Sequence, residues 1–206
     1  GPAIQAASQR AIEAGTTLTG ILDMVGRLRE SGLQTPLVLF SYYNVILQYG
    51  PERLAKVSAE VGIDGWLVVD MPSEEDGEIM PVLEKGGLHK ITLIAPTTPR
   101  ERTHDLLRKA SGFIYYITFK GVTGALTDLP ADLKEKLAAL RAHSDLPVVA
   151  GFGVSTPEMA RAVGAHADGV VVGSKLIQTI AEAEDADTGL KRGTELVKSL
   201  ARALRE

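Results

Sequence analysis

Cysteine is absent from the chain. Disulfide bridges, thiolate chemistry and cysteine-ligated metal sites are therefore excluded. The four histidines are widely separated and lack the paired spacing of a helix-borne metal site, so we expect no metal to be bound. These histidines are His89, His104, His143 and His166.

Long apolar runs and an excess of basic residues are also missing. No run approaches the ~18 apolar residues of a membrane span, and no signal-peptide pattern opens the sequence, so we expect a cytoplasmic protein outside membranes. The formal net charge of −4 argues against a nucleic-acid surface. The 206 residues, 45% of them hydrophobic, can bury one substantial core, and we predict a single domain over residues 1–206.

Short apolar runs rich in strand formers recur along the chain after turn residues. Each is nearly continuous in apolar character, which is typical of parallel strands covered on both faces. The six predicted strands are Pro36–Phe40, Gly65–Val69, Lys90–Ile94, Gly112–Ile117, Pro147–Ala150 and Gly169–Val172.

Amphipathic segments lie between these runs, two more precede the first run, and a long one ends the chain. Several begin with a hydroxyl residue followed by proline, as at Thr98-Pro99 and Thr156-Pro157, where the hydroxyl can cap a helix. The predicted helices are Pro2–Ala14, Leu18–Arg29, Gly50–Val61, Ser73–Lys85, Thr98–Ala110, Pro130–Arg141, Pro157–Gly164 and Thr188–Arg205.

Two architectures fit repeated strand–helix units with a parallel sheet. A doubly wound open sheet places its glycine-rich phosphate loop after the first strand. Here the glycines follow late strands, at Gly121–Gly124, Gly151–Gly153 and Gly173, which is where (β/α)8 barrels bind phosphate. We therefore predict an α/β protein with the TIM (β/α)8 barrel fold, of which six strand–helix units are visible in this chain.

An ordered set of motifs spans essentially the whole chain. The motifs are Gly1–Ala7, Tyr42–Asn44, Val69–Pro72, Ile94–Thr98, Gly121–Gly124, Gly151–Ser155 and Gly173–Ser174. Together they closely resemble the α subunit of tryptophan synthase. The resemblance implies a carbon–carbon lyase of L-tryptophan biosynthesis, which cleaves indole-3-glycerol phosphate by a retro-aldol reaction to indole and glyceraldehyde 3-phosphate.

The resemblance also indicates which catalytic groups the chain does not contain. In the family, a glutamate that ends the second strand protonates the indole ring, and an aspartate directly before the Gly-Pro motif stabilises charge at the indole N–H. About sixty family residues, including the first two barrel strands, lie upstream of Gly1. We therefore expect residues 1–206 alone to be inactive or nearly so. We also expect them to be poorly soluble or to bind a complementing fragment, because strand edges are exposed.

Three explanations of this difference remain open: a fragment of a normal enzyme, a truncated protein, and a natural remnant without catalysis. Asp70, the one carboxylate at an obvious strand end, has a different place in the family motif and is not expected to replace the missing acid.

The resemblance assigns phosphate binding to late loops. We expect the phosphate to bind backbone N–H groups, helped by a serine hydroxyl and a helix start, at Gly124, Gly153, Gly173 and Ser174. Thr123 matches a lid threonine whose loop closes over the site. Its partner in the family is the absent aspartate.

The remaining site residues match positions around the indole ring. The expected apolar walls are Phe40, Leu67, Leu93 and Phe152, with Tyr42 at the rim. Tyr115 matches a strand tyrosine near the family's catalytic glutamate, and we expect it to support catalysis by orienting the acid or the substrate.

A protein partner is implied as well. The family's α subunit docks on a pyridoxal-phosphate-dependent β subunit in an αββα heterotetramer, so the cofactor belongs to the partner and none is expected in this chain. Two other function classes stay open: a non-catalytic phosphate-ligand binder or β-subunit activator, and a different phosphate-handling barrel such as an isomerase or epimerase.

Overall fold

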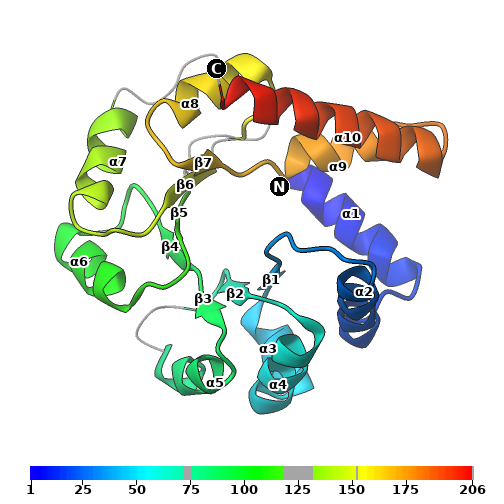
Figure 1. Cartoon of the computed structure of the whole chain (residues 1–206), viewed down its shortest axis with the longest axis horizontal. Helices are drawn as coiled ribbons and strands as arrows, with labels where there is room; N and C mark the ends of the chain where they lie inside the picture. Colours follow the sequence, from blue (N-terminus) through cyan, green and yellow to red (C-terminus); the bar gives the residue numbers. More distant parts are fainter. Residues whose placement is uncertain (72–75, 118–131, 152, 206) are drawn as a thin grey trace.

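Parallel strands follow one another in an arc, with helices on its outer side (Figure 1). The computed structural model describes residues 1–71, 76–117, 132–151 and 153–205. One sheet has the order β1-β2-β3 and the other β4-β5-β6-β7, with every pairing parallel. The strands are β1 (Val38–Ser41), β2 (Gly65–Val68), β3 (His89–Lys90), β4 (Thr92–Ile94), β5 (Ile114–Ile117), β6 (Val148–Gly151) and β7 (Gly169–Val170).

All six predicted runs form strands, but the third is divided. Ile91 separates β3 from β4, so the first half of this run pairs with β2 and the second half with β5. The curved order of parallel strands with helices outside is the arrangement expected of a TIM barrel.

Ten α-helices lie in the described part of the chain. They are α1 (Pro2–Glu13), α2 (Leu18–Glu30), α3 (Tyr43–Tyr49), α4 (Pro51–Val61), α5 (Met80–Lys85), α6 (Arg100–Lys109), α7 (Leu133–Arg141), α8 (Pro157–Gly164), α9 (Ser174–Ala181) and α10 (Ala186–Ala203). The predicted starts of the helices Ser73–Lys85 and Pro130–Arg141 lie outside the described residues.

The starts of three helices can be compared with the predicted helix boundaries. Thr156 caps α8 as predicted, since its side chain accepts a hydrogen bond from the Met159 backbone N–H. The predicted cap at Thr98 is wrong, because Thr98 Oγ1 accepts from the Ala95 backbone N–H and α6 begins only at Arg100. The last helix begins earlier than predicted because Asp185 caps it.

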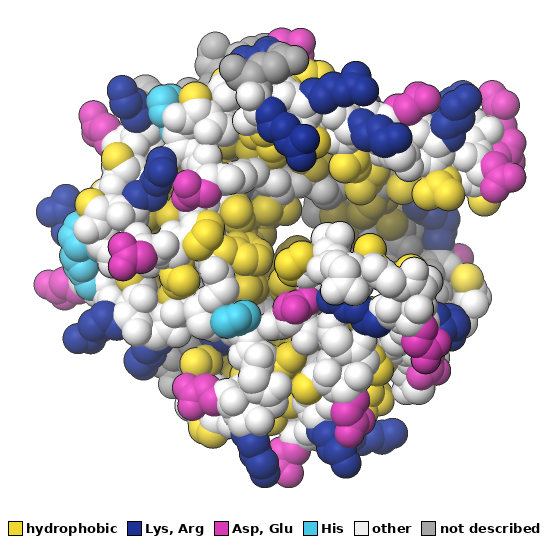
Figure 2. All heavy atoms as spheres, viewed as in Figure 1, with side chains coloured by type: hydrophobic (Ala, Val, Ile, Leu, Met, Phe, Trp, Pro, Cys, Tyr) yellow, Lys and Arg dark blue, Asp and Glu magenta, His cyan; other side chains and the backbone are white. Residues whose placement is uncertain are grey.

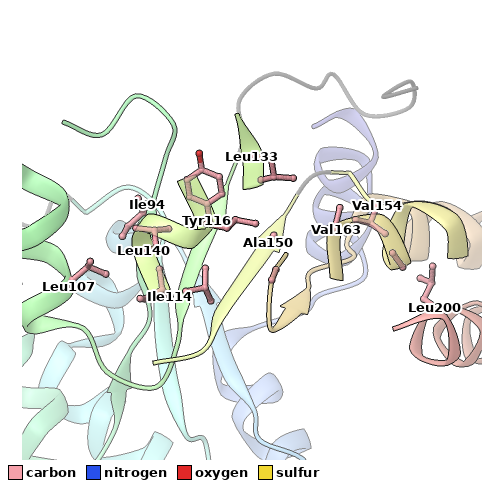
Figure 3. Packing of buried hydrophobic residues seen from close by; sticks show 14 of the residues in the cluster. Ile94, Leu107, Ile114, Tyr116, Leu133, Leu140, Ala150, Val154, Val163 and Leu200 are labelled. Atoms are coloured by element: carbon pink, nitrogen blue, oxygen red, sulfur yellow. The ribbon is translucent and has the colours of Figure 1, made fainter. Parts of the chain in front are cut away.

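The outer faces of the strands pack against the helices in two buried clusters. One surrounds Trp66 of β2, which is fully buried and donates from Nε1 to Ser58 Oγ on α4 at 3.1 Å. The other joins β4, β5 and β6 to α6, α7, α8 and α10, and Figure 3 shows Ile114, Tyr116 and Ala150 of the strands within it.

Successive side chains of a strand point to opposite faces of the sheet, so the residues next to those in the outer clusters point to the inner face. Because Trp66, Ile94 and Tyr116 belong to the outer clusters, their neighbours Leu67, Leu93 and Tyr115 point to the inside of the arc. Sequence neighbours are thereby separated into an outer layer that packs against the helices and an inner layer that faces the middle of the arc.

Two aspartates tie the amino ends of neighbouring strands together. Asp64, just before β2, accepts at Oδ2 from the Leu37 backbone N–H (2.7 Å) and from Arg29 (2.9 Å). Asp168, just before β7, accepts at Oδ2 from the Val148 backbone N–H at 2.8 Å, and its Oδ1 lies 3.2 Å from Arg141. Both groups lie at the end of the strands opposite to the late glycine loops.

Candidate active site

A cavity of about 890 Å³ lies at the carboxyl ends of the strands. Its wall combines residues that are far apart in the sequence: α1, the end of β1, β5 and β6, the loop before α8, and the first turns of α9. Figure 2 shows hydrophobic side chains gathered around a hollow in the middle of the molecule.

Six of the predicted site residues line this one cavity. They are Phe40, Tyr42, Tyr115, Gly153, Gly173 and Ser174. Phe40 and Tyr42 have exposed fractions of 60% and 62%, which are high for large aromatic residues at strand ends. The cavity therefore offers flat apolar surface on one side and glycine-rich backbone on another.

Two predicted wall residues lie elsewhere, although both face the inside of the arc. Leu67 is buried in β2 and does not line the cavity. Leu93 lines a smaller cavity of about 270 Å³, which also contains Lys90 and Thr92. The remaining predicted residues, Thr123, Gly124 and Phe152, lie outside the described part of the chain.

Tyr115 projects from β5 across β6. A Cβ atom built on Gly151 would lie 2.6 Å from Tyr115 Cε2, so only glycine leaves room for the phenol ring. The Tyr115 phenol is protonated at neutral pH, as any tyrosine is, and burial raises its pKa further above the ordinary value. It can therefore donate a hydrogen bond into the cavity.

Glycine residues shape the side of the cavity formed by the loop before α8 and the start of α9. Gly153 has φ of +66°, a left-handed conformation that L-residues rarely adopt. At Gly173, a Cβ atom would lie 3.5 Å from Ile4 Cδ1, which shows how closely α1 approaches the start of α9.

The start of α9 has no side-chain cap. Gly173 occupies the N-cap position and offers no side chain, and α1, α3, α4, α5, α6 and α7 likewise begin without a side-chain cap. Among the described helices, only α2, α8 and α10 are capped by a side chain, from Thr17, Thr156 and Asp185. The first N–H groups of α9 have no partner within their helix, and together with the helix dipole they favour an anion. This end of the cavity is suited to bind a phosphate group.

Sequence reasoning missed several polar residues of the cavity. They are Ser8, Ser41, Ser155, Lys175 and Gln178. Lys175 could have been found, since it directly follows the Gly173-Ser174 motif. The α1 residue Ser8 carried no such signal, because only the fold brings α1 to α9.

Asp70 serves the local structure. Its Oδ1 accepts a hydrogen bond from the Tyr43 backbone N–H at 2.7 Å, at the beginning of α3. The bond ties the end of β2 to the end of β1, and it gives Asp70 a loop-fixing role instead of an acid's role.

Metal ligands do not converge in the described residues, where no group of three histidine, aspartate or glutamate side chains could hold an ion. Among the same residues, no helix is both long and apolar enough to cross a membrane.

Comparisons with known proteins agree with one another. The family model of the tryptophan synthase alpha chain matches residues 1–205. A curated tryptophan synthase alpha chain from Geobacter sulfurreducens is 45% identical over 194 residues, which cover 94% of this chain and 73% of the relative.

Solved structures give the same match at the level of the fold. The crystal structure of a tryptophan synthase alpha chain from Legionella pneumophila has a TM-score of 0.89 and 37% identity, covering 100% of this chain and 76% of that chain. The tryptophan synthase alpha subunit of Pyrococcus furiosus has a TM-score of 0.85 and 30% identity, covering 98% of this chain and 80% of that chain.

Proposed function

Because the chain belongs to the tryptophan synthase alpha chain family, we propose that its large cavity binds indole-3-glycerol phosphate. The reaction of the family is the retro-aldol cleavage of this substrate to indole and glyceraldehyde 3-phosphate, a lyase step of L-tryptophan biosynthesis. One observation carries the proposal: a single cavity joins an apolar aromatic side to the uncapped start of α9. Those two features match the two ends of the substrate.

The phosphate end is assigned to the late loops. Backbone N–H groups at Gly153, Gly173 and Ser174, with the Ser174 hydroxyl, donate to the phosphate oxygens. Gly124 and the lid residue Thr123 are assigned to the same end on the family resemblance alone.

The indole end is assigned to the aromatic rim. Phe40 and Tyr42 offer apolar surface to the ring, and Tyr115 positions the reacting groups through its protonated phenol. Leu67, Leu93 and Phe152 complete the assignment on the resemblance alone.

Carbon–carbon cleavage requires a proton at indole C3 and stabilisation of charge at the indole N–H. No carboxylate belongs to the described lining of the cavity, so no described lining residue can fill the glutamate or aspartate role. We therefore propose that residues 1–206, assayed alone, bind ligand but turn it over slowly or not at all.

The partner and the location follow the family. We propose that the chain docks on a tryptophan synthase β subunit in an αββα complex, that pyridoxal phosphate is bound only by that partner, and that the complex is cytoplasmic.

An indole-release assay with indole-3-glycerol phosphate tests these proposals when calorimetry of inorganic phosphate binding accompanies it. We expect saturable phosphate binding and little indole release by the chain alone. Rapid indole release would overturn the inactivity proposal, whereas absence of phosphate binding would overturn the assignment of the cavity.

A further inference from the structure

Lys175 provides the only charged side chain among the described residues that line the large cavity. The other polar side chains of that lining are hydroxyl groups and one amide, and none is acidic. A ligand that enters therefore meets a positive charge with no neighbouring negative charge in the described wall.

The ammonium group of Lys175 has no partner in the part of the chain that the structure describes. No hydrogen bond or ion pair joins its side chain to another described residue. By comparison, Lys136 Nζ lies 2.6 Å from Asp132 Oδ2. Lys56 Nζ lies 3.9 Å from Glu60 Oε1. Lys175 is also half-buried, so its charge is less screened by solvent than that of an exposed lysine.

The positive charge of Lys175 is electrostatically unfavourable at its position in α9. It is the second residue of α9, and a cation in the first turn opposes the helix dipole. The first turns of α4, α6, α7, α8 and α10 each contain an acidic residue, whereas α9, like α1, α2, α3 and α5, has none. A bound anion would compensate both the helix dipole and the lysine charge.

We propose that Lys175 is a specificity-determining residue that supplies a positive charge to the substrate phosphate, beside the backbone N–H groups of Gly173 and Ser174. This inference rests on the proposed function of the cavity. A lysine ammonium is a compact point charge, and it favours a phosphate dianion over a neutral or singly charged group of the same size. Glyceraldehyde 3-phosphate keeps the phosphate after cleavage, so Lys175 also holds this product.

Isothermal titration calorimetry with two separate probes, inorganic phosphate and indole, tests the role of Lys175. The variants are Lys175→Gln, which removes the charge, and Lys175→Arg, which retains it. Lys191→Gln is the matched control, because Lys191 is an exposed lysine of α10 outside the cavity. We expect Lys175→Gln to weaken phosphate binding about tenfold and to leave indole binding unchanged, with Lys175→Arg and Lys191→Gln close to the parent chain.

The outcomes separate this inference from the proposed function. Equal phosphate affinity in the parent chain and Lys175→Gln overturns the role of Lys175 and leaves the cavity assignment intact. Absence of phosphate binding by the parent chain overturns both. Parallel loss of phosphate and indole binding in Lys175→Gln, or an equal loss in Lys191→Gln, overturns the specificity role, because a general structural change then explains the result.

Discussion

The phenol ring of Tyr115 lies against the backbone of Gly151 on the neighbouring strand. A Cβ atom at Gly151 would lie 2.6 Å from Cε2 and 2.8 Å from Cζ of this ring, well inside any normal contact. The orientation of Tyr115 in the cavity therefore depends on the absence of a side chain one strand away.

Gly151→Ala is expected to lower the free energy of unfolding by about 1–3 kcal/mol, because the added methyl group must displace the ring or the strand. Urea unfolding followed by circular dichroism measures the change. In a Tyr115→Leu background the same substitution should cost much less, since the ring is gone. Equal costs in the two backgrounds would refute the contact as the cause.

Arg29→Ala is expected to lower the free energy of unfolding by about 2–3 kcal/mol, because it leaves two partly buried carbonyl oxygens, those of Gly62 and Leu33, without this donor. Arg29 donates to the carbonyl oxygens of Gly62, Leu33 and Thr35 and to Asp64. Chemical denaturation gives the value. Lys56→Ala, which removes an exposed ion pair, should change stability by less than about 0.5 kcal/mol. Similar costs for the two variants would contradict this account of Arg29.

The stability of the fold should fall as the pH rises above 10. Burial raises the pKa of Tyr116, and the negative charge of Asp132 raises it by a smaller amount, from 10.0 to about 12 in all. The folded state therefore holds this proton more tightly than the unfolded state. The resulting contribution of Tyr116 to the free energy of unfolding is complete below pH 10 and is lost as the pH rises to about 12. Urea unfolding at a series of pH values should show this decline, and Tyr116→Phe should show less of it. An unchanged slope in Tyr116→Phe would exclude Tyr116 as the group.

Ser174→Ala should weaken the binding of inorganic phosphate about threefold to tenfold, the loss expected when one neutral hydrogen bond is removed. Calorimetry measures the affinity, and thermal unfolding shows whether the helix start is preserved. Ser31→Ala is the control, since that hydroxyl is exposed and donates to the Leu28 carbonyl oxygen. Unchanged phosphate affinity in Ser174→Ala would show that this hydroxyl does not bind the phosphate.

The strands were predictable because each is a short apolar run between turn residues. The division at Ile91 was not, since an apolar run does not reveal where a curved sheet changes its hydrogen-bonded neighbour. The short helix α3 was missed for a related reason. Its start depends on a hydrogen bond from the Tyr43 backbone N–H to Asp70, which is distant in the sequence.

The candidate site was predictable where the backbone conformation favours glycine, as at Gly153 with its positive φ. Phe40 and Tyr42 came from the resemblance and also line the cavity. Ser8 could not be predicted, because its place in the wall is set by how α1 packs on α9.

The two aspartates at the amino ends of the strands, one at each of two strand pairs, have a consequence for how this protein can change during evolution. Asp64 binds the backbone N–H of Leu37, directly before β1, and Asp168 binds the backbone N–H of Val148 in β6. A slip of one residue in either strand pairing would break that bond. Strand register is therefore secured at one end of the sheet, away from the ligand cavity. Loops at the other end are free to acquire substitutions that alter ligand preference without misaligning the strands that carry them.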